Sequence, residues 1–243
     1  MPRIVTYNVH RCVGNDRRLD VPRIAAVLAA LNPDIVALQE LDVGRRRTNH
    51  VDQAHEIAER LEMVSHFHPA FTVEEERYGD AILTALPERL VKSAALPGYP
   101  KIAALEPRGA LWVEVQVDGR PLQIINTHLG LVPKEQQIQA AHLAGPAWLG
   151  HPDCQWPAIL LGDFNATASS VVYRTLTQHL QPARRLAKRK QTSSTFPSPL
   201  PVLRIDHHFV SPGIDVQDVF APYDPLCRVA SDHLPLVMDF ELT

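Results

Sequence analysis

The sequence predicts an α/β protein in which two packed β-sheets carry helices on their outer faces. Strand-like and helix-like segments alternate along the chain, and both halves of the chain contain several strands. Many of the apolar runs are short and nearly continuous, which is typical of strands that are buried on both faces. The chain contains no internal repeat, linker or low-complexity tract, so we expect a single domain over residues 1–243.

The first strand, at residues 4–8, is followed by a helix with clear boundaries. Asp20 is a suitable N-cap, and Pro22 stands in the first turn, where its missing N–H does no harm. The sequence Asn32-Pro33 then ends the helix. Between these signals the apolar residues recur with the period of one helix face, at Val21, Ile24, Val27, Leu28 and Leu31.

The next elements are strands, a second helix and a hairpin. A strand at residues 34–40 follows the first helix directly, and the second helix begins near Asp52. The sequence Val117-Asp118-Gly119-Arg120 is typical of a hairpin turn between two strands. Apolar runs predict strands around residues 81–86, 110–117 and 122–126.

The remaining elements again alternate. Pro133 begins a helix that we expect to run to about Leu149. A strand that ends in Asp163 is followed by a helix near residues 170–180. The final two strands are predicted at residues 205–210 and 234–242.

Polar side chains stand at the ends of many of these strands. Asp163 and Asn165 are two residues apart, so their side chains should leave the strand on the same face. An acid beside an amide suits a hard cation and the phosphate that it holds, although Asp and Asn also begin turns after strands. The other strand ends favour a site for a cation and phosphate over simple turns, because they also carry polar residues: Asn8, Glu40, His128, Asp206 and the pair Asp232-His233.

These motifs, in this order, resemble the endonuclease/exonuclease/phosphatase superfamily. Its members include pancreatic-type deoxyribonucleases, apurinic-site endonucleases, bacterial sphingomyelinases and inositol polyphosphate phosphatases. The resemblance spans nearly the whole chain, from Asn8 to His233, and implies a four-layer α/β sandwich and metal-dependent hydrolysis of phosphoesters. The matching segments are Tyr-Asn-Val, Gln-Glu, Thr-His-Leu, Gly-Asp-Phe-Asn, Ile-Asp-His and Ser-Asp-His.

The resemblance assigns a metal site to the first two motifs. Glu40 matches the metal-binding glutamate of the family, Asn8 matches the asparagine beside it, and Asp232 matches a second acidic residue near the metal. Mg²⁺ is usually held by one or two carboxylates together with water and substrate phosphate oxygens. We therefore expect Mg²⁺, with Mn²⁺ able to substitute, and the number of ions stays open.

The catalytic residues implied by the resemblance are histidines and aspartates. His233 matches a catalytic histidine, and Asp206 matches the carboxylate that fixes its tautomer. Asp163 matches the residue that orients or activates the attacking water. Whether Asp163 or the His233–Asp206 pair is the general base stays open.

Further residues are matched to the substrate phosphate. Asn165 matches a phosphate-binding residue, and His128 matches a phosphate-contacting histidine that acts as an acid in deoxyribonuclease-like members. Those members pair it with a glutamate that corresponds to Glu76, which also fits a solvated acidic run. Arg108 fits a phosphate contact and a solvated bend equally well. Asp80 stands where many relatives have Asn, so the resemblance gives it no role.

Composition limits the compartment and the partners. The three cysteines include no C-x-x-C pair, which argues against a disulfide framework and a thiolate zinc site. No apolar run approaches the ~18 residues of a membrane span, and the first strand follows Met1-Pro2-Arg3 directly, without room for a signal peptide. We therefore expect a cytoplasmic protein without stable membrane insertion, and we expect a monomer.

Three substrate classes fit the motifs: a nucleic acid, a phospholipid headgroup and a small phosphorylated metabolite. Basic segments near the site motifs favour a nucleic acid, although a charge run is also a common solvated surface. The net charge of −3 and the aromatic content of 6% argue against one. We rank a nuclease first, ahead of a sphingomyelinase-like enzyme and a small-molecule phosphatase, and a non-catalytic binding module is the rival class. The basic segments are Arg45-Arg46-Arg47, Arg184-Arg185 and Lys188-Arg189-Lys190.

Overall fold

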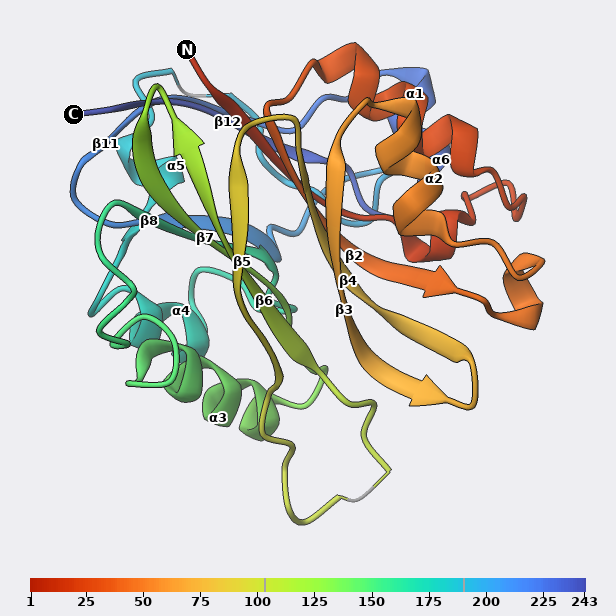
Figure 1. Cartoon of the computed structure of the whole chain (residues 1–243), viewed down its shortest axis with the longest axis horizontal. Coiled ribbons are helices and arrows are strands. Elements are labelled where there is room, and N and C mark those ends of the chain that lie inside the picture. The colour runs from red at the N-terminus through yellow and green to blue at the C-terminus, as the bar shows by residue number, and fades with distance from the viewer. Residues whose placement is uncertain (103, 190) are drawn as a thin grey trace.

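The computed structural model describes residues 1–102, 104–189 and 191–243. Within these residues the strands form two six-stranded sheets of mixed pairing. The sheets pack face to face, and helices lie on both outer sides (Figure 1). This arrangement is the four-layer α/β sandwich that the resemblance implied.

The first sheet brings the two ends of the chain together. Its strand order is β11-β12-β1-β2-β4-β3, and β12 pairs with β1 in antiparallel fashion while β1 and β2 are parallel. Its strands are β1 (Arg3–Asn8), β2 (Ile35–Val43), β3 (Val64–Val73), β4 (Glu76–Thr84), β11 (Ile214–Phe220) and β12 (Leu236–Leu242).

The second sheet is built from the middle of the chain. Its order is β5-β6-β7-β8-β10-β9, with β7 and β8 parallel and the other neighbours antiparallel. Its strands are β5 (Glu88–Ala95), β6 (Gly109–Val117), β7 (Arg120–His128), β8 (Ala158–Asp163), β9 (Gln181–Pro182) and β10 (Asp206–Val210).

The helices divide between the two outer faces (Figure 1). On the side of the first sheet lie α1 (Val21–Leu31), α2 (Gln53–Arg60) and α6 (Pro225–Ala230). On the side of the second sheet lie α3 (Pro133–Ala144) and α4 (Val171–Leu176). The short α5 (Ala183–Leu186) packs at the edge formed by β10 and β11. None of the helices in the described part of the chain is long and apolar enough to cross a membrane.

Local sequence signals account for several boundaries. The Asp20 side chain accepts a hydrogen bond from the Arg23 backbone N–H at 2.9 Å, which caps α1 as expected. Asn32 ends α1 in the left-handed conformation with φ of 47°. Asp118 and Gly119 both have positive φ, 52° and 76°, as a two-residue hairpin turn requires.

Other predicted boundaries were wrong. The helix from Pro133 ends at Ala144, because the following Gly145-Pro146 cannot continue it. The helix expected near residues 170–180 covers only Val171–Leu176. The strands β3, β5 and β11 were not foreseen, since polar residues interrupt their apolar patterns, and β11 lies between the two strands predicted to be last.

A buried polar network connects the two sheets behind the strand ends. Gln39 Nε2 of β2 donates to Asn126 Oδ1 of β7 at 2.8 Å. Asn126 Nδ2 donates to the backbone oxygens of Leu38 and Ala81, each at 2.9 Å. Buried amides of this kind are costly unless satisfied, so the network fixes how the sheets sit against each other. It thereby sets the relative positions of Glu40 and His128, which stand next along β2 and at the end of β7.

Candidate active site

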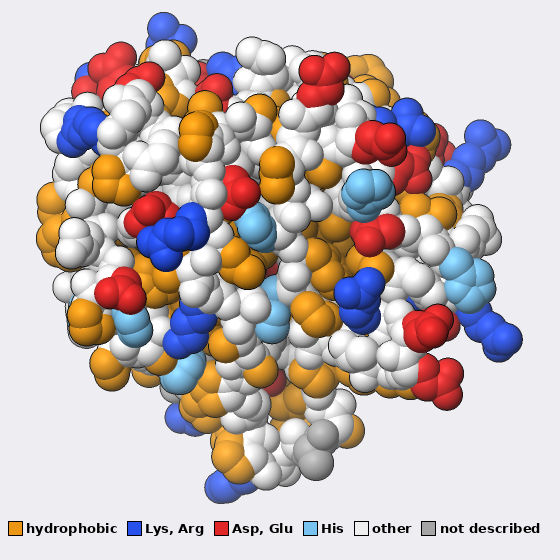
Figure 2. All heavy atoms as spheres, viewed as in Figure 1, with side chains coloured by type: hydrophobic (Ala, Val, Ile, Leu, Met, Phe, Trp, Pro, Cys, Tyr) orange, Lys and Arg blue, Asp and Glu red, His pale blue; other side chains and the backbone are white. Residues whose placement is uncertain are grey.

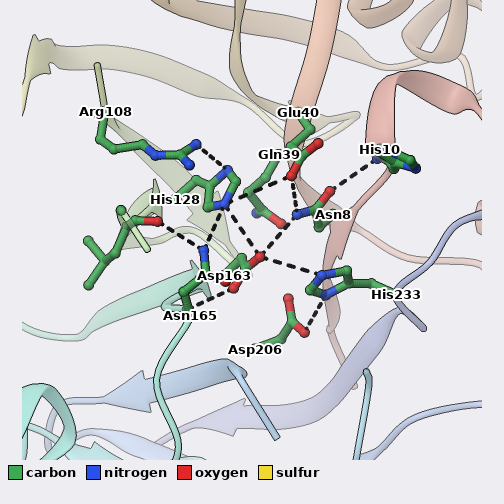
Figure 3. Close-up of polar contacts among 12 residues, drawn as sticks. Asn8, His10, Gln39, Glu40, Arg108, His128, Asp163, Asn165, Asp206 and His233 are labelled. Carbon is green, nitrogen blue, oxygen red and sulfur yellow. Dashed lines mark hydrogen bonds and ion pairs between the residues drawn. The ribbon is translucent and has the colours of Figure 1, made fainter. Parts of the chain in front are cut away.

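The polar strand ends meet around one pocket of about 340 Å³ (Figure 3). The strand register explains why. His128 is the parallel partner of Asp163, and Asp163 is the antiparallel partner of Asp206, so three adjacent strands place these residues at one level. The first sheet contributes Glu40 from the opposite side, and His233 comes from the segment before β12.

Glu40 is directed into the pocket by an irregularity in β2. The pairing of β2 with β4 shifts between Leu38 and Leu41, and Glu40 has φ of 62°, which is uncommon for a residue with a side chain. Such bulges redirect side chains and are frequent beside functional sites. Asn8 Nδ2 donates to Glu40 Oε1 at 2.9 Å and to Asp163 Oδ2 at 3.0 Å, so one amide joins the two carboxylates.

The donor set fits a hard divalent cation. Glu40 and Asp163 approach each other across Asn8, and the buried Asp80 is close enough to both to interact electrostatically with them. Burial raises the pKa of Asp80 to about 8, while Arg108 opposes this rise. Burial and the nearby Asp206 also raise the pKa of Asp163. Carboxylates held together in this way are stabilised by added positive charge, and oxygen ligands suit Mg²⁺ and Mn²⁺.

A second group of possible ligand atoms lies next to the first. One atom each from Asp163, Asp206 and His233 lie within 4.8 Å of one another. His233 Nδ1 is 2.9 Å from Asp206 Oδ2, and its Nε2 is 3.6 Å from Asp163 Oδ2. Because the protonated imidazole already bridges the two carboxylates, this group is better explained as an ion-pair network than as a metal site.

His233 is held in one orientation. Burial alone would lower its pKa, but Asp206 and Asp163 outweigh burial and raise it. The Phe196 ring packs against the imidazole, with centroids 4.9 Å apart. Thr195 Oγ1 donates to the same Asp206 oxygen that contacts His233. The imidazole is therefore a fixed hydrogen-bond donor toward Asp163 and the pocket.

Arg108 determines the tautomer of His128. Arg108 Nη1 lies 3.0 Å from His128 Nδ1, and a guanidinium can only donate, so Nδ1 accepts and the proton resides on Nε2. Burial, Arg108 and His233 all lower the pKa of His128, which keeps the ring neutral. Nε2 lies 3.5 Å from Asp163 Oδ2. His128 therefore presents an N–H group to the centre of the pocket.

Asn165 is positioned by the turn that follows β8. Its backbone N–H donates to Asp163 Oδ1 at 2.8 Å, and its φ is 48°. Its side-chain Nδ2 donates to the Leu129 backbone oxygen at 3.0 Å and lies 3.1 Å from His128 Nε2. The amide thus stands beside His128 at the pocket wall (Figure 3).

One predicted site residue lies away from the pocket, and another lies at its rim. Glu76 does not pair with His128. Its carboxylate accepts from the Arg46 backbone N–H at 3.1 Å and from Arg45 Nε at 3.4 Å, which draws it to the basic segment. Asp232 lines the pocket at its rim, where Oδ1 is 3.9 Å from His10 Nδ1.

Several residues around the pocket carry no motif that predicts them as site residues. His10 and Arg11 line it from a short turn after β1 in which both have positive φ. Arg47, which was expected only as part of a basic segment near the site, also lines the pocket, and its guanidinium is bound to Asp42 at 2.6 and 2.7 Å. Phe196 gave no motif signal. In the basic segment Lys188-Arg189-Lys190, Lys190 lies outside the described residues.

The hairpin that joins β6 and β7 brings the chain near Arg108 close to His128. The turn at Asp118-Gly119 pairs Val117 with Arg120, and the pairing continues without a shift to Ala110 and Thr127. Extending this register by one step sets Gly109 opposite His128, which brings Arg108 within one residue of that position.

Solved structures with the same fold include proteins of different stated activities. An endonuclease/exonuclease/phosphatase from Beutenbergia cavernae is 25% identical, with a TM-score of 0.80 over 99% of this chain and 71% of that one. A mannosyl-6-phosphatase from Bacteroides thetaiotaomicron is 20% identical, with a TM-score of 0.79 over all of both chains. The human Nocturnin catalytic domain is 21% identical, with a TM-score of 0.72 over 100% of this chain and 93% of that one.

No match was found among curated proteins. A family model described as the endonuclease/exonuclease/phosphatase family matches residues 5–233, which include every motif of the pocket. The fold, the order of the motifs and this match agree. The chain therefore belongs to the endonuclease/exonuclease/phosphatase family of phosphoester hydrolases.

Proposed function

We propose that the protein is a divalent-metal-dependent phosphodiesterase that acts on a nucleic acid. The observation that supports this most strongly is the His233–Asp206 pair, which faces Asp163 in the pocket that also holds Glu40. Glu40 would hold Mg²⁺ or Mn²⁺, with Asn8 and Asp232 nearby. Bound there, the cation would act as a Lewis acid and stabilise negative charge on the phosphoryl oxygens and the leaving oxygen.

Asp163 orients the attacking water and accepts its proton. Its raised pKa makes the carboxylate a better base, and its Oδ2 faces the Nε2 atoms of His128 and His233 at 3.5 and 3.6 Å. His233 is already protonated beside Asp206, so it serves as a charged donor rather than as the base. As the new P–O bond forms, the bond to the leaving oxygen breaks in line with it.

The remaining polar groups stabilise the developing charge. His128 Nε2–H and the Asn165 amide stand side by side and donate to phosphoryl oxygens. In deoxyribonuclease-like relatives a carboxylate partner would let this histidine act as an acid. Because Arg108 takes that place here, we assign His128 to charge stabilisation.

The pocket wall favours a phosphate-rich substrate with an aromatic part. Arg11, Arg47 and Arg108 line it together with the rings of Tyr78 and Phe196. Arginine side chains bind phosphate, and aromatic rings stack on bases. Figure 2 shows acidic and basic side chains interspersed over the face it presents, without an extended basic track. On this face a polynucleotide would therefore meet no continuous run of basic side chains.

A small phosphorylated metabolite is the second candidate. The confined volume of about 340 Å³ favours it, as does the similar fold of a bacterial mannosyl-6-phosphatase. A phospholipid headgroup ranks third. We further propose that the protein acts as a cytoplasmic monomer, and size-exclusion chromatography with light scattering tests the oligomeric state.

One substrate panel separates these candidates. Plasmid DNA, single-stranded RNA, sugar phosphates, sphingomyelin and phosphoinositides are incubated with the protein under identical Mg²⁺ and Mn²⁺ conditions. The His233→Ala variant, purified in the same way, measures contaminating nuclease. We expect cleavage of DNA or RNA that weakens as salt rises, because phosphate contacts release counterions. Rapid hydrolysis of a sugar phosphate or lipid with intact nucleic acids would overturn the nuclease assignment.

A further inference from the structure

The arginines that line the catalytic pocket differ in how their charges are balanced. The Arg47 guanidinium is bound by the buried carboxylate of Asp42 at 2.6 and 2.7 Å. Arg108 Nη1 lies 2.8 Å from Glu106 Oε1. In contrast, the half-buried Arg11 forms no ion pair with any described residue. Of these pocket arginines, Arg11 is therefore the one whose charge is left for an anionic group of the substrate.

Arg11 lies in a backbone segment with an uncommon conformation. His10, Arg11 and Cys12 have φ of 44°, 57° and 57°, in the left-handed region that residues with side chains rarely adopt. Strained backbone of this kind persists only where the surrounding structure holds it, and it is frequent at binding sites. Local stability does not account for such a run, whereas a need to place its side chains in the pocket does.

Two buried amides hold this segment in place. The Gln53 side chain is fully buried, and its Nε2 donates to the Arg11 backbone oxygen at 2.7 Å. Asn8 Oδ1 accepts from the His10 backbone N–H at 3.0 Å. Through its Nδ2, the same Asn8 amide donates to the two carboxylates at the centre of the pocket. The segment that carries Arg11 is therefore fixed directly to the catalytic centre.

The His10 imidazole orients the Arg11 guanidinium. Arg11 Nη2 lies 2.9 Å from His10 Nε2, and a guanidinium can only donate, so Nε2 accepts and the proton resides on Nδ1. That Nδ1 lies 3.9 Å from Asp232 Oδ1, so the imidazole faces the guanidinium with one nitrogen and the carboxylate with the other. Arg11 Nε is buried, and the other N–H groups of its terminal nitrogens have no acceptor among the described residues. These terminal groups are the ones that a ligand can meet.

We propose that Arg11 binds a second phosphate group of the substrate, next to the phosphate that is cleaved. This inference rests on the proposed function and makes Arg11 a specificity-determining residue. The groups that would contact the cleaved phosphate surround Asp163, which lies on the other side of Asn8 from His10 (Figure 3). An anion bound to Arg11 therefore belongs to a different phosphate. The guanidinium fork matches the oxygens of such a group.

The number of phosphates in the substrate should therefore affect its affinity. A substrate with a single phosphate leaves the Arg11 guanidinium in contact with water alone, so a sugar monophosphate should bind more weakly than a nucleotide with two phosphates. Two kinds of nucleotide carry the second group. In a polynucleotide a sugar separates the phosphates, and in a nucleoside diphosphate the two share an oxygen.

Binding of nucleotides to the full-length protein in EDTA tests the proposal without catalysis. Calorimetry measures the dissociation constants of thymidine 5′-monophosphate, thymidine 3′,5′-bisphosphate and thymidine 5′-diphosphate. We expect one of the two-phosphate ligands to bind at least tenfold more tightly than the monophosphate, and the tighter one identifies the spacing. Equal affinity for all three would overturn the proposal. Because no hydrolysis is involved, this result is independent of whether the substrate panel supports a nuclease.

Variants separate the charge of Arg11 from its shape. Arg11→Gln removes the charge and should abolish most of the preference for the second phosphate, whereas Arg11→Lys keeps the charge and should retain most of it. Arg60→Gln is the matched control, because Arg60 is an exposed arginine of α2 that does not line the pocket. Its preference should equal that of the wild type. Equal losses in Arg11→Gln and Arg60→Gln would contradict the assigned contact.

A further variant guards against a change of fold. Glycine adopts positive φ without strain, so Arg11→Gly should keep the wild-type melting temperature while it removes the whole side chain. It should lose the preference for the second phosphate as Arg11→Gln does. A wild-type preference in Arg11→Gly would show that another group binds the second phosphate and would overturn the proposal.

Discussion

His233 lies between two carboxylates, and this position determines its chemistry. Asp206 fixes Nδ1 at 2.9 Å, and Asp163 faces Nε2 at 3.6 Å. We expect His233→Ala to lower kcat roughly 10²–10⁴-fold, because it removes a positioned charged donor. Initial rates at saturating substrate provide the measurement. His55→Ala, an exposed histidine on α2, should keep the wild-type rate. Near-normal turnover in His233→Ala would refute the site assignment.

His208 should make stability depend on pH. Its pKa is about 3 in the folded protein and ~6.5 in an unfolded chain, so above pH ~6.5 it is neutral in both states. As pH falls below that value, only the unfolded chain takes up the proton, and stability is lost at up to ~1.4 kcal/mol per pH unit.

His208→Leu should remove this loss. Urea unfolding at pH 7 and pH 5 measures the free energy of unfolding of both proteins. Between the two pH values the wild type should lose roughly 1–2 kcal/mol more than the variant. Parallel losses in the two proteins would show that His208 is protonated in the folded state, contrary to its burial.

At the scale of elements, two glycines with positive φ should respond differently to substitution. Gly162 in β8 has φ of 140°, and a Cβ there would lie 1.8 Å from the Thr127 backbone oxygen of β7. Gly119 in the hairpin turn has φ of 76° and nothing within 4 Å. Gly162→Ala must therefore separate two strands, whereas Gly119→Ala only strains the backbone.

The expected results follow from this contrast. Gly119→Ala should cost about 1 kcal/mol of stability and preserve activity, because the turn is remote from the pocket. Gly162→Ala should cost more stability and also reduce kcat, since Asp163 is the next residue and pairs with His128 across the same strands. Thermal unfolding and initial rates measure both effects. Equal behaviour of the two variants would mean that the strand spacing does not position the site.

Elements with strong local signals were predictable, and elements without them were not. The caps at Asp20 and Asn32 define α1 because they act within one turn. In contrast, β3 contains Pro69 and two histidines and lies at the edge of its sheet, so pairing with β4 rather than its own pattern makes it a strand.

At the scale of the whole molecule, the site depends on how the two sheets pack. Asn126 accepts from Gln39 and donates to two backbone oxygens of the opposite sheet. We expect Asn126→Leu to lower the free energy of unfolding by roughly 3 kcal/mol or more, because leucine leaves several buried groups unpaired. It should also reduce kcat by shifting Glu40 relative to His128. Urea unfolding tests the first effect, and unchanged stability would contradict it.

Site residues that stand at the ends of strands could be predicted from the sequence. Site residues that only the tertiary structure brings to the pocket could not. Asp163, Asp206 and His128 share one level because three strands are in register. By contrast, Phe196 contacts His233 from an irregular segment, and no periodic sequence pattern predicts such a contact. Glu76 matches a family motif that predicts a pair with His128. In the structure its carboxylate instead accepts hydrogen bonds from Arg45 Nε and the Arg46 backbone N–H.

The metal-binding role of Glu40 is tested most directly by hydrolysis of bis(p-nitrophenyl) phosphate. Rates are measured for the wild type, Glu40→Gln and the control Glu59→Gln, which changes an exposed glutamate of α2. Each protein is treated with EDTA and then titrated with Mg²⁺ or Mn²⁺. We predict that EDTA abolishes wild-type activity, that either ion restores it, and that only Glu40→Gln needs at least tenfold more metal. Undiminished wild-type hydrolysis in EDTA, or identical metal titrations for Glu40→Gln and the wild type, would contradict a metal-dependent hydrolase centred on Glu40.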